Sequence, residues 1–263
     1  MRKRPSVKPI LTSLCFISIL LIQSCGPFIK REKFDLEGKG LYDRIARSHL
    51  PWSVWAKSVE GRNIYLLDLG EGEKITLIFG AFHGNELLSG ELVYRFSEYL
   101  HDEMRQKLDC KVILVPIVNP DGLIRGKRTN ANDVDINRNF PTENWSQTFR
   151  SKSHFPGSNP GSEPETRAVI QLLKSYPPDR IISIHTPLTM VNFDGPAHDL
   201  ANRMSKWNGY PVQGDIGYPT PGSFGTYAGI EKNIPTITLE LGVESFKKVW
   251  QKNRNALLEA LLY

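Results

Sequence analysis

The sequence predicts an α/β fold, a single-domain sandwich in which helices flank a mixed, largely parallel central sheet. Two observations support this prediction. Short apolar runs of strand length, such as residues 74–82 and 180–185, alternate with longer stretches whose apolar residues recur at helical spacing. The short runs are almost continuously apolar, as is typical of strands in a sheet that helices cover on both faces.

The expected elements alternate along most of the chain. Strands are expected at residues 62–69, 74–82, 110–118, 180–185 and 236–241. Helices are expected at residues 86–106, 162–176, about 197–207 and from about Phe246 onward. Only the turn "GEGE" separates the first two strands, so we expect them to be neighbours in the sheet. In sheets of this class, ligands bind beyond the carboxyl ends of the strands.

The first 25 residues have the order of an export signal. Residues 1–8 are basic and contain no acid, an uncharged apolar run follows, and "LIQSC" ends the segment at Cys25. The apolar run is too short to span a bilayer as a stable helix. "LIQSC" resembles a bacterial lipobox, which implies that residues 1–24 are a lipoprotein signal peptide and that Cys25 carries lipid. The alternative is an ordinary signal that is cut nearby and leaves Cys25 as a thiol.

Beyond Cys25 we expect a tether and then one domain. Residues 25–50 begin with a charged, glycine-containing stretch of little apolar periodicity, which is typical of a linker. Residues 51–263 are long enough to form a single domain with a sizeable core. A lipid on Cys25 holds such a domain at a membrane without spanning it. We therefore expect a lipid-anchored protein on the periplasmic side of the bacterial cell envelope, at the outer rather than the inner membrane because Gly26 follows Cys25.

Charge and cysteine content argue against two kinds of function. Removal of residues 1–24 takes away four basic residues and no acid, which lowers the formal net charge from +5 to +1. A near-neutral chain lacks the clustered basic surface of nucleic-acid-binding proteins, so we expect no nucleic-acid partner. Cys110 is the cysteine that remains if Cys15 is removed and Cys25 is lipidated. It begins an apolar run and is interpreted as a small buried residue rather than a nucleophile.

Polar side chains lie at the ends of three expected strands. His83 and Glu86 come just after the second strand, and His185 ends the fourth. Glu240 lies near the end of the fifth, in an apolar run where an unpaired carboxylate is costly. A His-x-x-Glu pair alone is weak evidence of a metal, but two histidines and a glutamate are a common catalytic zinc set with a fourth position open to water. The other histidines are interpreted as surface residues without a recognisable partner: His49, His101, His154 and His198.

Six motifs in sequence order carry a resemblance to a known family. They are "HGNE", "NPDG", "RTNANDVDINRNF", "SIHTP", "GYPTPGSFG" and "TLELG", and they cover most of the chain beyond the tether. In this order they resemble the zinc carboxypeptidase family, and within it the bacterial murein peptide amidase branch. The resemblance implies a zinc carboxypeptidase-like catalytic domain at residues 51–263 with one zinc ion per chain.

The family's catalytic residues match positions of this sequence. The resemblance implies that His83, Glu86 and His185 bind zinc. Glu240 is then the general base for hydrolysis by a zinc-activated water. Arg128 matches the position that stabilises the negative oxygen of the tetrahedral intermediate.

The resemblance also implies residues that bind the substrate. Asn137 and Arg138 match the pair that holds a substrate carboxylate, a task that suits a planar guanidinium. Asp135 matches the acid that orients a zinc-binding histidine. Tyr218 matches the mobile tyrosine that covers bound substrate, and Phe224 is expected near the floor of the specificity pocket.

The resemblance and the expected location together point to a substrate. The matching branch cleaves the amide between γ-D-glutamate and meso-diaminopimelate in murein peptides, so we expect a peptidoglycan-derived peptide. The alternatives are a carboxypeptidase for ordinary L-peptides and a deacylase of small N-acyl amino acids, because "HGNE" also occurs in that related branch. A wall-binding lipoprotein without activity is a further alternative, against which the complete set of expected catalytic residues argues.

Overall fold

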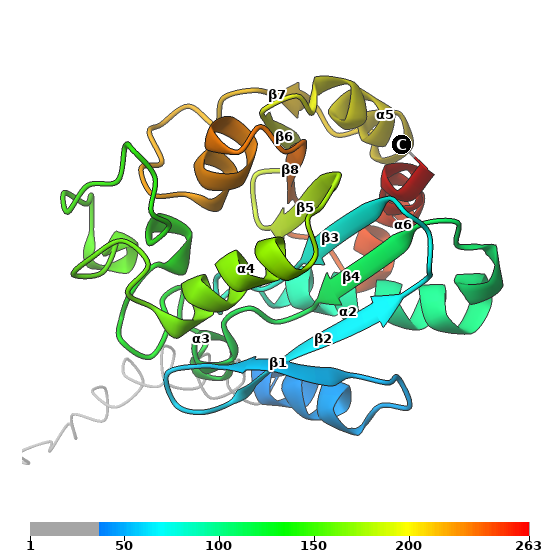
Figure 1. Cartoon of the computed structure of the whole chain (residues 1–263), viewed down its shortest axis with the longest axis horizontal. Helices are drawn as coiled ribbons and strands as arrows, with labels where there is room; N and C mark the ends of the chain where they lie inside the picture. The colour runs from blue at the N-terminus through cyan, green and yellow to red at the C-terminus, as the bar shows by residue number, and fades with distance from the viewer. Residues whose placement is uncertain (1–36, 263) are drawn as a thin grey trace, which may run out of the picture.

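Within residues 37–262, which the computed structural model describes, eight strands form one sheet (Figure 1). The strands lie in the order β1-β2-β4-β3-β5-β8-β6-β7. Their bounds are Ser53–Lys57 (β1), Asn63–Leu69 (β2), Ile75–Phe79 (β3), Lys111–Val115 (β4), Arg180–His185 (β5), Met190–Asp194 (β6), Val212–Gln213 (β7) and Thr236–Glu240 (β8).

The middle of the sheet is parallel, and antiparallel pairs lie on either side of it. β3 pairs in parallel with β4 and β5, and β5 pairs in parallel with β8. β2 runs antiparallel to β4, and β6 runs antiparallel to β8. The prediction of a mixed, largely parallel sheet flanked by helices is confirmed. Because β3, β5 and β8 are parallel, their carboxyl ends meet at the same edge of the sheet.

Helices cover both faces of this sheet. The longer helices are α2 (Leu87–Tyr99), α4 (Pro164–Ser175), α5 (His198–Asn208) and α6 (Phe246–Leu262). In Figure 1, α4 lies in front of the sheet, and α2 and α6 lie behind it. The sheet is therefore the middle layer of the sandwich, and each of its faces is buried.

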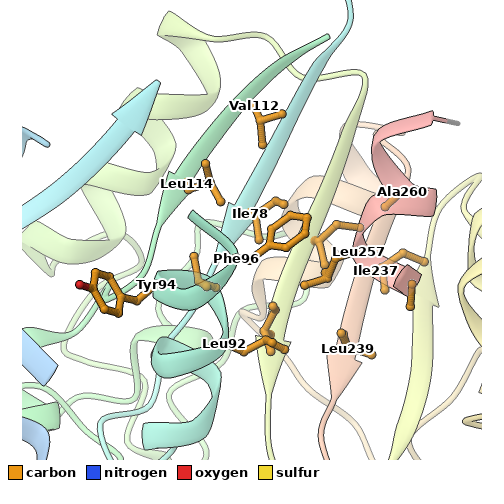
Figure 2. Packing of buried hydrophobic residues seen from close by; sticks show 14 of the residues in the cluster. Ile78, Leu92, Tyr94, Phe96, Val112, Leu114, Ile237, Leu239, Leu257 and Ala260 are labelled. Atoms are coloured by element: carbon orange, nitrogen blue, oxygen red, sulfur yellow. The ribbon is translucent and has the colours of Figure 1, made fainter. Parts of the chain in front are cut away.

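Successive residues of the central strands point alternately into two apolar cores, as the two-residue period of a strand requires. Ile78 of β3 and Leu239 of β8 belong to the core beneath α2 and α6, which Figure 2 shows from close by. Leu77 and Phe79 of β3 point the other way, into the core beneath α4. Each such side chain is fully buried and stabilises the fold by about 1.5–3 kcal/mol.

The expected pairing of the first two strands is wrong. β4 lies between β2 and β3, so the connection between them is not a hairpin. This connection passes close to the residues that lead into β4. A Cβ at Gly72 would lie 1.9 Å from the carbonyl oxygen of Asp109, so a glycine is required there. The turn residues were recognised correctly, but they serve a crossing connection whose path long-range strand pairing determines.

The folded part of the chain begins earlier than expected. Residues 37–47, within the expected tether of residues 25–50, form a helix. Its Leu41 and Ile45, four residues apart and so on one helix face, are buried in the core beneath α2. The expected signal peptide and Cys25 lie outside the described residues. No helix in the described part of the chain is both long enough and apolar enough to cross a membrane.

Four short elements were not expected from the sequence. They are the strands β1, β6 and β7 and the helix α3, which spans Pro120–Arg125. The helix expected at residues 86–106 also changes its geometry along its length. α2 ends at Tyr99, and a π-helical turn (η1, Leu100–Met104) and a 3-10 turn (η2, Arg105–Lys107) follow it.

Candidate metal centre and active-site cleft

The carboxyl ends of β5 and β8 place two polar side chains on one face of the sheet. Ile184 and Leu239 point into the core beneath α2 and α6. The next residue of each strand, His185 or Glu240, points to the opposite face because successive side chains alternate. His185 and Glu240 are also register partners in the parallel β5–β8 pair. Both therefore line the same cleft, which has a volume of about 190 Å³.

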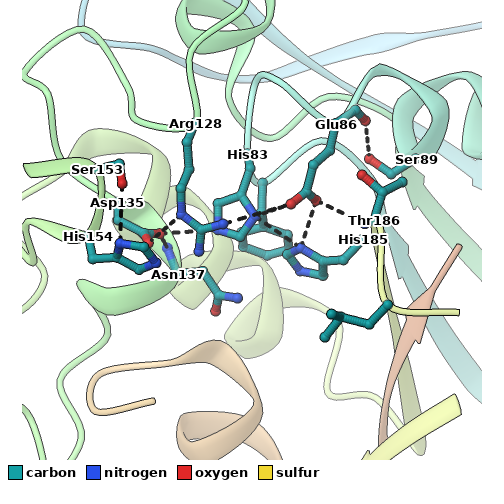
Figure 3. Close-up of polar contacts among 12 residues, drawn as sticks. His83, Glu86, Ser89, Arg128, Asp135, Asn137, Ser153, His154, His185 and Thr186 are labelled. Atoms are coloured by element: carbon teal, nitrogen blue, oxygen red, sulfur yellow. Dashed lines mark hydrogen bonds and ion pairs between the residues drawn. The ribbon is translucent and has the colours of Figure 1, made fainter. Parts of the chain in front are cut away.

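Three side chains from two strand ends converge in this cleft (Figure 3). Nδ1 of His83 lies 2.7 Å from Oε1 of Glu86, and Nδ1 of His185 lies 2.9 Å from Oε2 of Glu86. The two Nδ1 atoms are 3.2 Å apart. All three residues are buried. The convergence expected from the sequence is present in the structure.

This set of donor atoms fits a zinc ion. Zinc binds nitrogen and oxygen ligands at about 2.0–2.2 Å in a tetrahedral arrangement, which requires ligand atoms roughly 3.3 Å apart. The observed separations of 2.7–3.2 Å come close to this value. Two imidazoles and one carboxylate also leave a coordination position for water or substrate, as in catalytic zinc sites.

The charges of this centre stabilise one another. Burial alone would raise the pKa of Glu86, but His83 and His185 outweigh it and lower the pKa to about 2. Glu86 is therefore ionised at neutral pH, as a metal ligand has to be. Burial and the nearby Arg128 disfavour a charge on His83, whereas Glu86 and Asp135 raise its pKa overall.

Asp135 holds both His83 and Arg128 in place. Its Oδ1 lies 3.2 Å from Nε2 of His83, and its Oδ2 accepts a hydrogen bond of 2.9 Å from Nε of Arg128 (Figure 3). Burial would raise the pKa of Asp135, but His83 and Arg128 hold it well below its usual range. The contact with Nε2 leaves Nδ1 of His83 to face the centre. The guanidinium of Arg128 borders the centre, 3.9 Å from Oε1 of Glu86.

Two residues that the sequence reasoning missed hold His185. Oγ of Ser183 lies 3.1 Å from Nε2 of His185. The ring of Phe82 stacks on the imidazole with a centroid distance of 5.7 Å and an interplanar angle of 19°. Ser183 precedes His185 by two residues and so lies on the same face of β5, a spacing that was available as a signal.

Glu240 lies beside the metal centre and is largely buried. Its Oε2 accepts a hydrogen bond of 3.3 Å from the backbone N–H of Leu188. Burial raises the pKa of Glu240, and the opposing effect of His185 does not cancel this increase. A raised pKa brings this carboxylate closer to the neutral range, where a general base is effective.

Arg138 is a buried cation at the edge of the cleft. It closes the 3-10 turn η3 (Ile136–Arg138), and its guanidinium donates a hydrogen bond of 2.6 Å to the backbone carbonyl of Asn137. Burial lowers its pKa, and within the described residues no carboxylate forms an ion pair with it. A buried guanidinium in this state attracts an anion, and a carboxylate matches its geometry. Asn137 lines the cleft beside it, and its Oδ1 accepts a hydrogen bond of 2.8 Å from Phe224 N–H.

Tyr218 lies at the rim of the cleft, in the glycine- and proline-rich loop expected from the sequence. It lines the cleft and is 37% exposed. The guanidinium of Arg150 lies 5.5 Å from the centroid of its ring, which is close enough for a cation–π contact.

Phe224, expected near the floor of the specificity pocket, does not itself line the cleft. Its ring is 1% exposed and packs edge-on or tilted against other phenylalanines of the core beneath α4. The residues on either side of it, Ser223 and Gly225, line the cleft instead. The aromatic ring buries more apolar surface in the core than it would at a polar cleft, so the backbone presents its smaller neighbours to the substrate.

Strand β6 brings a further carboxylate, that of Asp194, into the cleft. Asn192 and Asp194 line the cleft, whereas Phe193 between them packs against the apolar core beneath α2 and α6. Burial raises the pKa of Asp194 to about 6. A Cβ at residue 225 would lie 2.2 Å from Oδ2 of Asp194, so Gly225 makes room for this carboxylate. The sequence reasoning missed both polar residues because it did not expect β6, although the alternation "VNFD" was a signal.

Like Arg138, Asp194 forms no ion pair with another described residue. In the part of the chain that the structure describes, no lysine, arginine or histidine side chain forms an ion pair with Asp194. A buried guanidinium and a partly buried carboxylate therefore border one cleft, and each is available to a ligand.

The fold and this centre define a class of protein. The family model for zinc carboxypeptidases matches residues 52–202, and the chain belongs to this family of zinc-dependent hydrolases.

Individual relatives fall within the same family. Murein peptide amidase A of Vibrio campbellii is 36% identical over 220 residues, which are 79% of this chain and 86% of that protein. The crystal structure of the murein-tripeptide amidase from Escherichia coli O157 matches with a TM-score of 0.71 and 31% identity, over 84% of this chain and 96% of that one. Carboxypeptidase A from Helicoverpa armigera shares the fold, with a TM-score of 0.68 and 17% identity over 88% of this chain and 81% of that one.

Proposed function

We propose that this protein is a zinc-dependent amidase that hydrolyses the bond between γ-D-glutamate and meso-diaminopimelate in peptidoglycan-derived peptides. The names of two relatives, a murein peptide amidase and a murein-tripeptide amidase, support this substrate class. The observation that carries the proposal is that Arg138 and Asp194, which form no ion pair with another described residue, border one cleft. A substrate residue with both a free carboxylate and an ammonium group, such as diaminopimelate, would pair with both.

In the proposed reaction, the residues around the cleft have different roles. His83, Glu86 and His185 would hold one catalytic zinc ion per chain, which supplies Lewis acidity and activates water. Glu240 accepts a proton from the attacking water and returns it to the nitrogen of the leaving amine. Arg128 donates a hydrogen bond to the negative oxygen that forms at the attacked carbonyl. Loss of one such donor typically costs about 3–4 kcal/mol of transition-state stabilisation.

The diaminopimelate residue fits the remaining polar groups. Asn137 and Arg138 bind the carboxylate next to the scissile amide. Asp194 pairs with the ammonium at the far end of the diaminopimelate side chain. With a pKa of about 6, Asp194 is mostly ionised at neutral pH, and a bound ammonium group favours its charged form further. Tyr218 at the rim covers the bound residue.

A second candidate function is a carboxypeptidase for L-peptides that end in a basic residue. Asp194 favours this candidate as well, because a lysine or arginine side chain also carries a positive charge to the far end of the cleft. The two candidates differ in the acyl group, which is γ-D-glutamyl in one case and an ordinary L-residue in the other.

The experiment compares four substrates with the purified, zinc-loaded full-length chain. They are L-Ala-γ-D-Glu-meso-diaminopimelate, the same peptide with norleucine in place of diaminopimelate, an L-peptide ending in lysine, and an N-succinyl amino acid. We expect rapid release of diaminopimelate and at most slow cleavage of the other three. The Glu240→Gln variant, inactive by design, controls for contaminating peptidases.

Other outcomes would indicate a different activity. Preferred cleavage of the lysine peptide would identify a basic carboxypeptidase, and preferred cleavage of the succinyl compound a deacylase. If no substrate is cleaved while zinc is bound, the proposal of an amidase is wrong.

We also propose that Cys25 carries a lipid that anchors the protein at the periplasmic side of the outer membrane. The "LIQSC" sequence before Gly26 supports this proposal. The mass of the N-terminal peptide after detergent extraction is expected to match an acylated Cys25. Membrane fractionation by density then distinguishes the outer from the inner membrane. We expect the unchanged protein in the membrane fraction and the Cys25→Ser variant in the soluble fraction. The same distribution of both proteins would contradict the proposal.

A further inference from the structure

A second group of histidine and carboxylate side chains lies outside the cleft. It consists of His49, just after the helix at residues 37–47, and of His101 and Asp102 in the π-helical turn η1. α2 begins one residue after Glu86 and ends just before η1. A helix of 13 residues is about 20 Å long, so α2 separates this group from the metal centre in the cleft.

The three side chains meet at one carboxylate oxygen. Oδ1 of Asp102 lies 2.9 Å from Nε2 of His49 and 2.8 Å from Nδ1 of His101. The two imidazole rings meet edge to face, with centroids 5.6 Å apart. In the described part of the chain, this is one of two groups in which three metal-binding side chains bring their ligand atoms within 4.8 Å of one another.

The backbone around this group has an unusual geometry. In a regular α-helix, side chains one residue apart point in directions that differ by about 100°, so they do not face the same partner. His101 and Asp102 are adjacent in sequence, yet both contact His49, His101 through its ring and Asp102 through its carboxylate. They lie in a π-helical turn, a rare geometry that occurs frequently at functional sites.

The metal centre in the cleft provides a standard for comparison. There the ligand atoms of His83 and His185 lie 2.7 and 2.9 Å from oxygens of Glu86. The corresponding distances at Asp102 are 2.9 and 2.8 Å. A shift of a few tenths of an ångström would bring these two nitrogen–oxygen distances to the roughly 3.3 Å spacing of tetrahedral zinc ligands, and all three ligand atoms already lie within 4.8 Å of one another. This movement is small for these side chains, because His49 and Asp102 are largely exposed.

We propose that His49, His101 and Asp102 form a second zinc-binding site, distinct from the catalytic centre. Two imidazole nitrogens and one carboxylate oxygen are ligand types that zinc prefers, and the exposed position leaves a fourth place for water. This proposal of a second zinc site holds whichever substrate the catalytic cleft binds.

A zinc ion at this site would join two segments that are distant in sequence. His49 follows the helix at residues 37–47, and His101 follows α2. An ion that binds both only in the folded state stabilises the packing of the first described helix against the rest of the domain. The proposed role is therefore structural, and turnover is expected to be unaffected by its loss.

Zinc titration of the chelator-treated full-length protein tests the proposal, with zinc chloride as the only ligand. The unchanged protein is expected to bind two ions per chain. His49→Ala and His83→Ala should each bind one, and the double variant none. Asp102→Asn preserves the shape of the side chain and should also bind one ion. It replaces His49→Ala as the test if removal of His49 disturbs folding.

His198→Ala is the matched control. His198 is exposed and lies 3.7 Å from the carboxylate of the adjacent Asp199, but among residues 37–262 it does not form such a group with a second histidine. This variant should still bind two ions. In the His83→Ala background, added zinc should raise the melting temperature, and the further His49→Ala change should abolish that increase.

The results that overturn the proposal are specific. If the unchanged protein and His49→Ala bind the same number of zinc ions, the second site does not exist. If His83→Ala binds as many ions as the unchanged protein, the assignment of the catalytic centre is at fault instead. Turnover by zinc-loaded His49→Ala should equal that of the unchanged protein within about twofold, and a larger loss would contradict a structural role.

Discussion

The two faces of the sheet differ at the carboxyl ends of β5 and β8, although both are buried there. On one face, Ile184 and Leu239 pack into an apolar layer beneath α2 and α6 (Figure 2). On the other face, His185 and Glu240 border the cleft and are only 3% and 8% exposed. Adjacent residues of one strand are thus almost equally buried, but one side chain is apolar and the other is polar or charged.

Along a single strand, the residues on one face therefore contribute to stability and those on the other face to activity. Apolar burial stabilises the fold, whereas burial of charged groups destabilises it unless partners compensate. Leu239 gains from its position, and Glu240 retains a raised pKa because its surroundings compensate only in part. Substitutions at neighbouring positions should therefore affect different properties of the protein.

The largest expected effect is that of Glu240→Gln on turnover. Loss of a general base typically lowers kcat by about 10²–10⁴-fold. The melting temperature should stay the same or rise, because a neutral amide replaces a buried carboxylate. Both quantities are measured on one zinc-loaded preparation. Full activity of this variant would show that another residue is the base.

Leu239→Ala should have the opposite profile. Removal of a fully buried leucine typically destabilises a protein by about 2–5 kcal/mol, and urea unfolding measures this loss. The kcat per folded molecule should fall by far less than in Glu240→Gln, since Leu239 points away from the cleft. A large loss of kcat at unchanged stability would contradict the division between the two faces.

Asp135→Asn should weaken zinc binding at the catalytic centre. Substitution of a residue that orients a metal ligand typically costs about 10–100-fold in metal affinity. Chelator competition measures the affinity. Asp133→Asn is the control, because Asp133 lies two residues away but is exposed and pairs with Lys127 at 3.1 Å. Equal zinc affinity in both variants would remove Asp135 from the centre.

The smallest expected effect is a pH-dependent preference for a charged substrate. Below its pKa of about 6, Asp194 is protonated and cannot attract an ammonium group. The ratio of kcat/KM for the diaminopimelate peptide to that for its norleucine analogue should therefore rise about tenfold from pH 5 to pH 7. Because other titrating groups affect both substrates, the ratio isolates Asp194. Asp194→Asn should give a flat ratio, and the same rise in this variant would exclude Asp194.

Much of the fold was predictable because the central strands are nearly continuous apolar runs. The strands β3, β4, β5 and β8 were expected at the positions where they occur. Their order was not fully predictable, because β4 pairs between β2 and β3 through contacts that a local turn signal does not encode. The short strands at the edges and the helix at residues 37–47 were missed, since short or charged segments carry little apolar periodicity of their own.

The site was predictable where a side chain follows directly from a strand end. His83, Glu86 and His185 converge as expected because parallel strands bring their carboxyl ends together. The sequence does not show which way a side chain of an irregular loop points, so it could not show that Phe224 packs into the core while Ser223 and Gly225 line the cleft. The approach of His49 to His101, across 52 positions in the chain, arises from tertiary packing and had no local signal.

The direction of β6 has a consequence for the length of the substrate side chain that fits the cleft. β6 runs antiparallel to β8, so Met190 is level with Glu240 and each later residue lies farther from the reacting bond. An antiparallel strand advances about 3.4 Å per residue, so Asn192 and Asp194 stand at two depths separated by about 7 Å. In the proposed role of Asp194, the position of this acid on β6 sets the length of the side chain that the cleft accepts. Moving that acid by one step of the alternation, from residue 194 to residue 192, would shorten the accepted side chain without altering the catalytic centre.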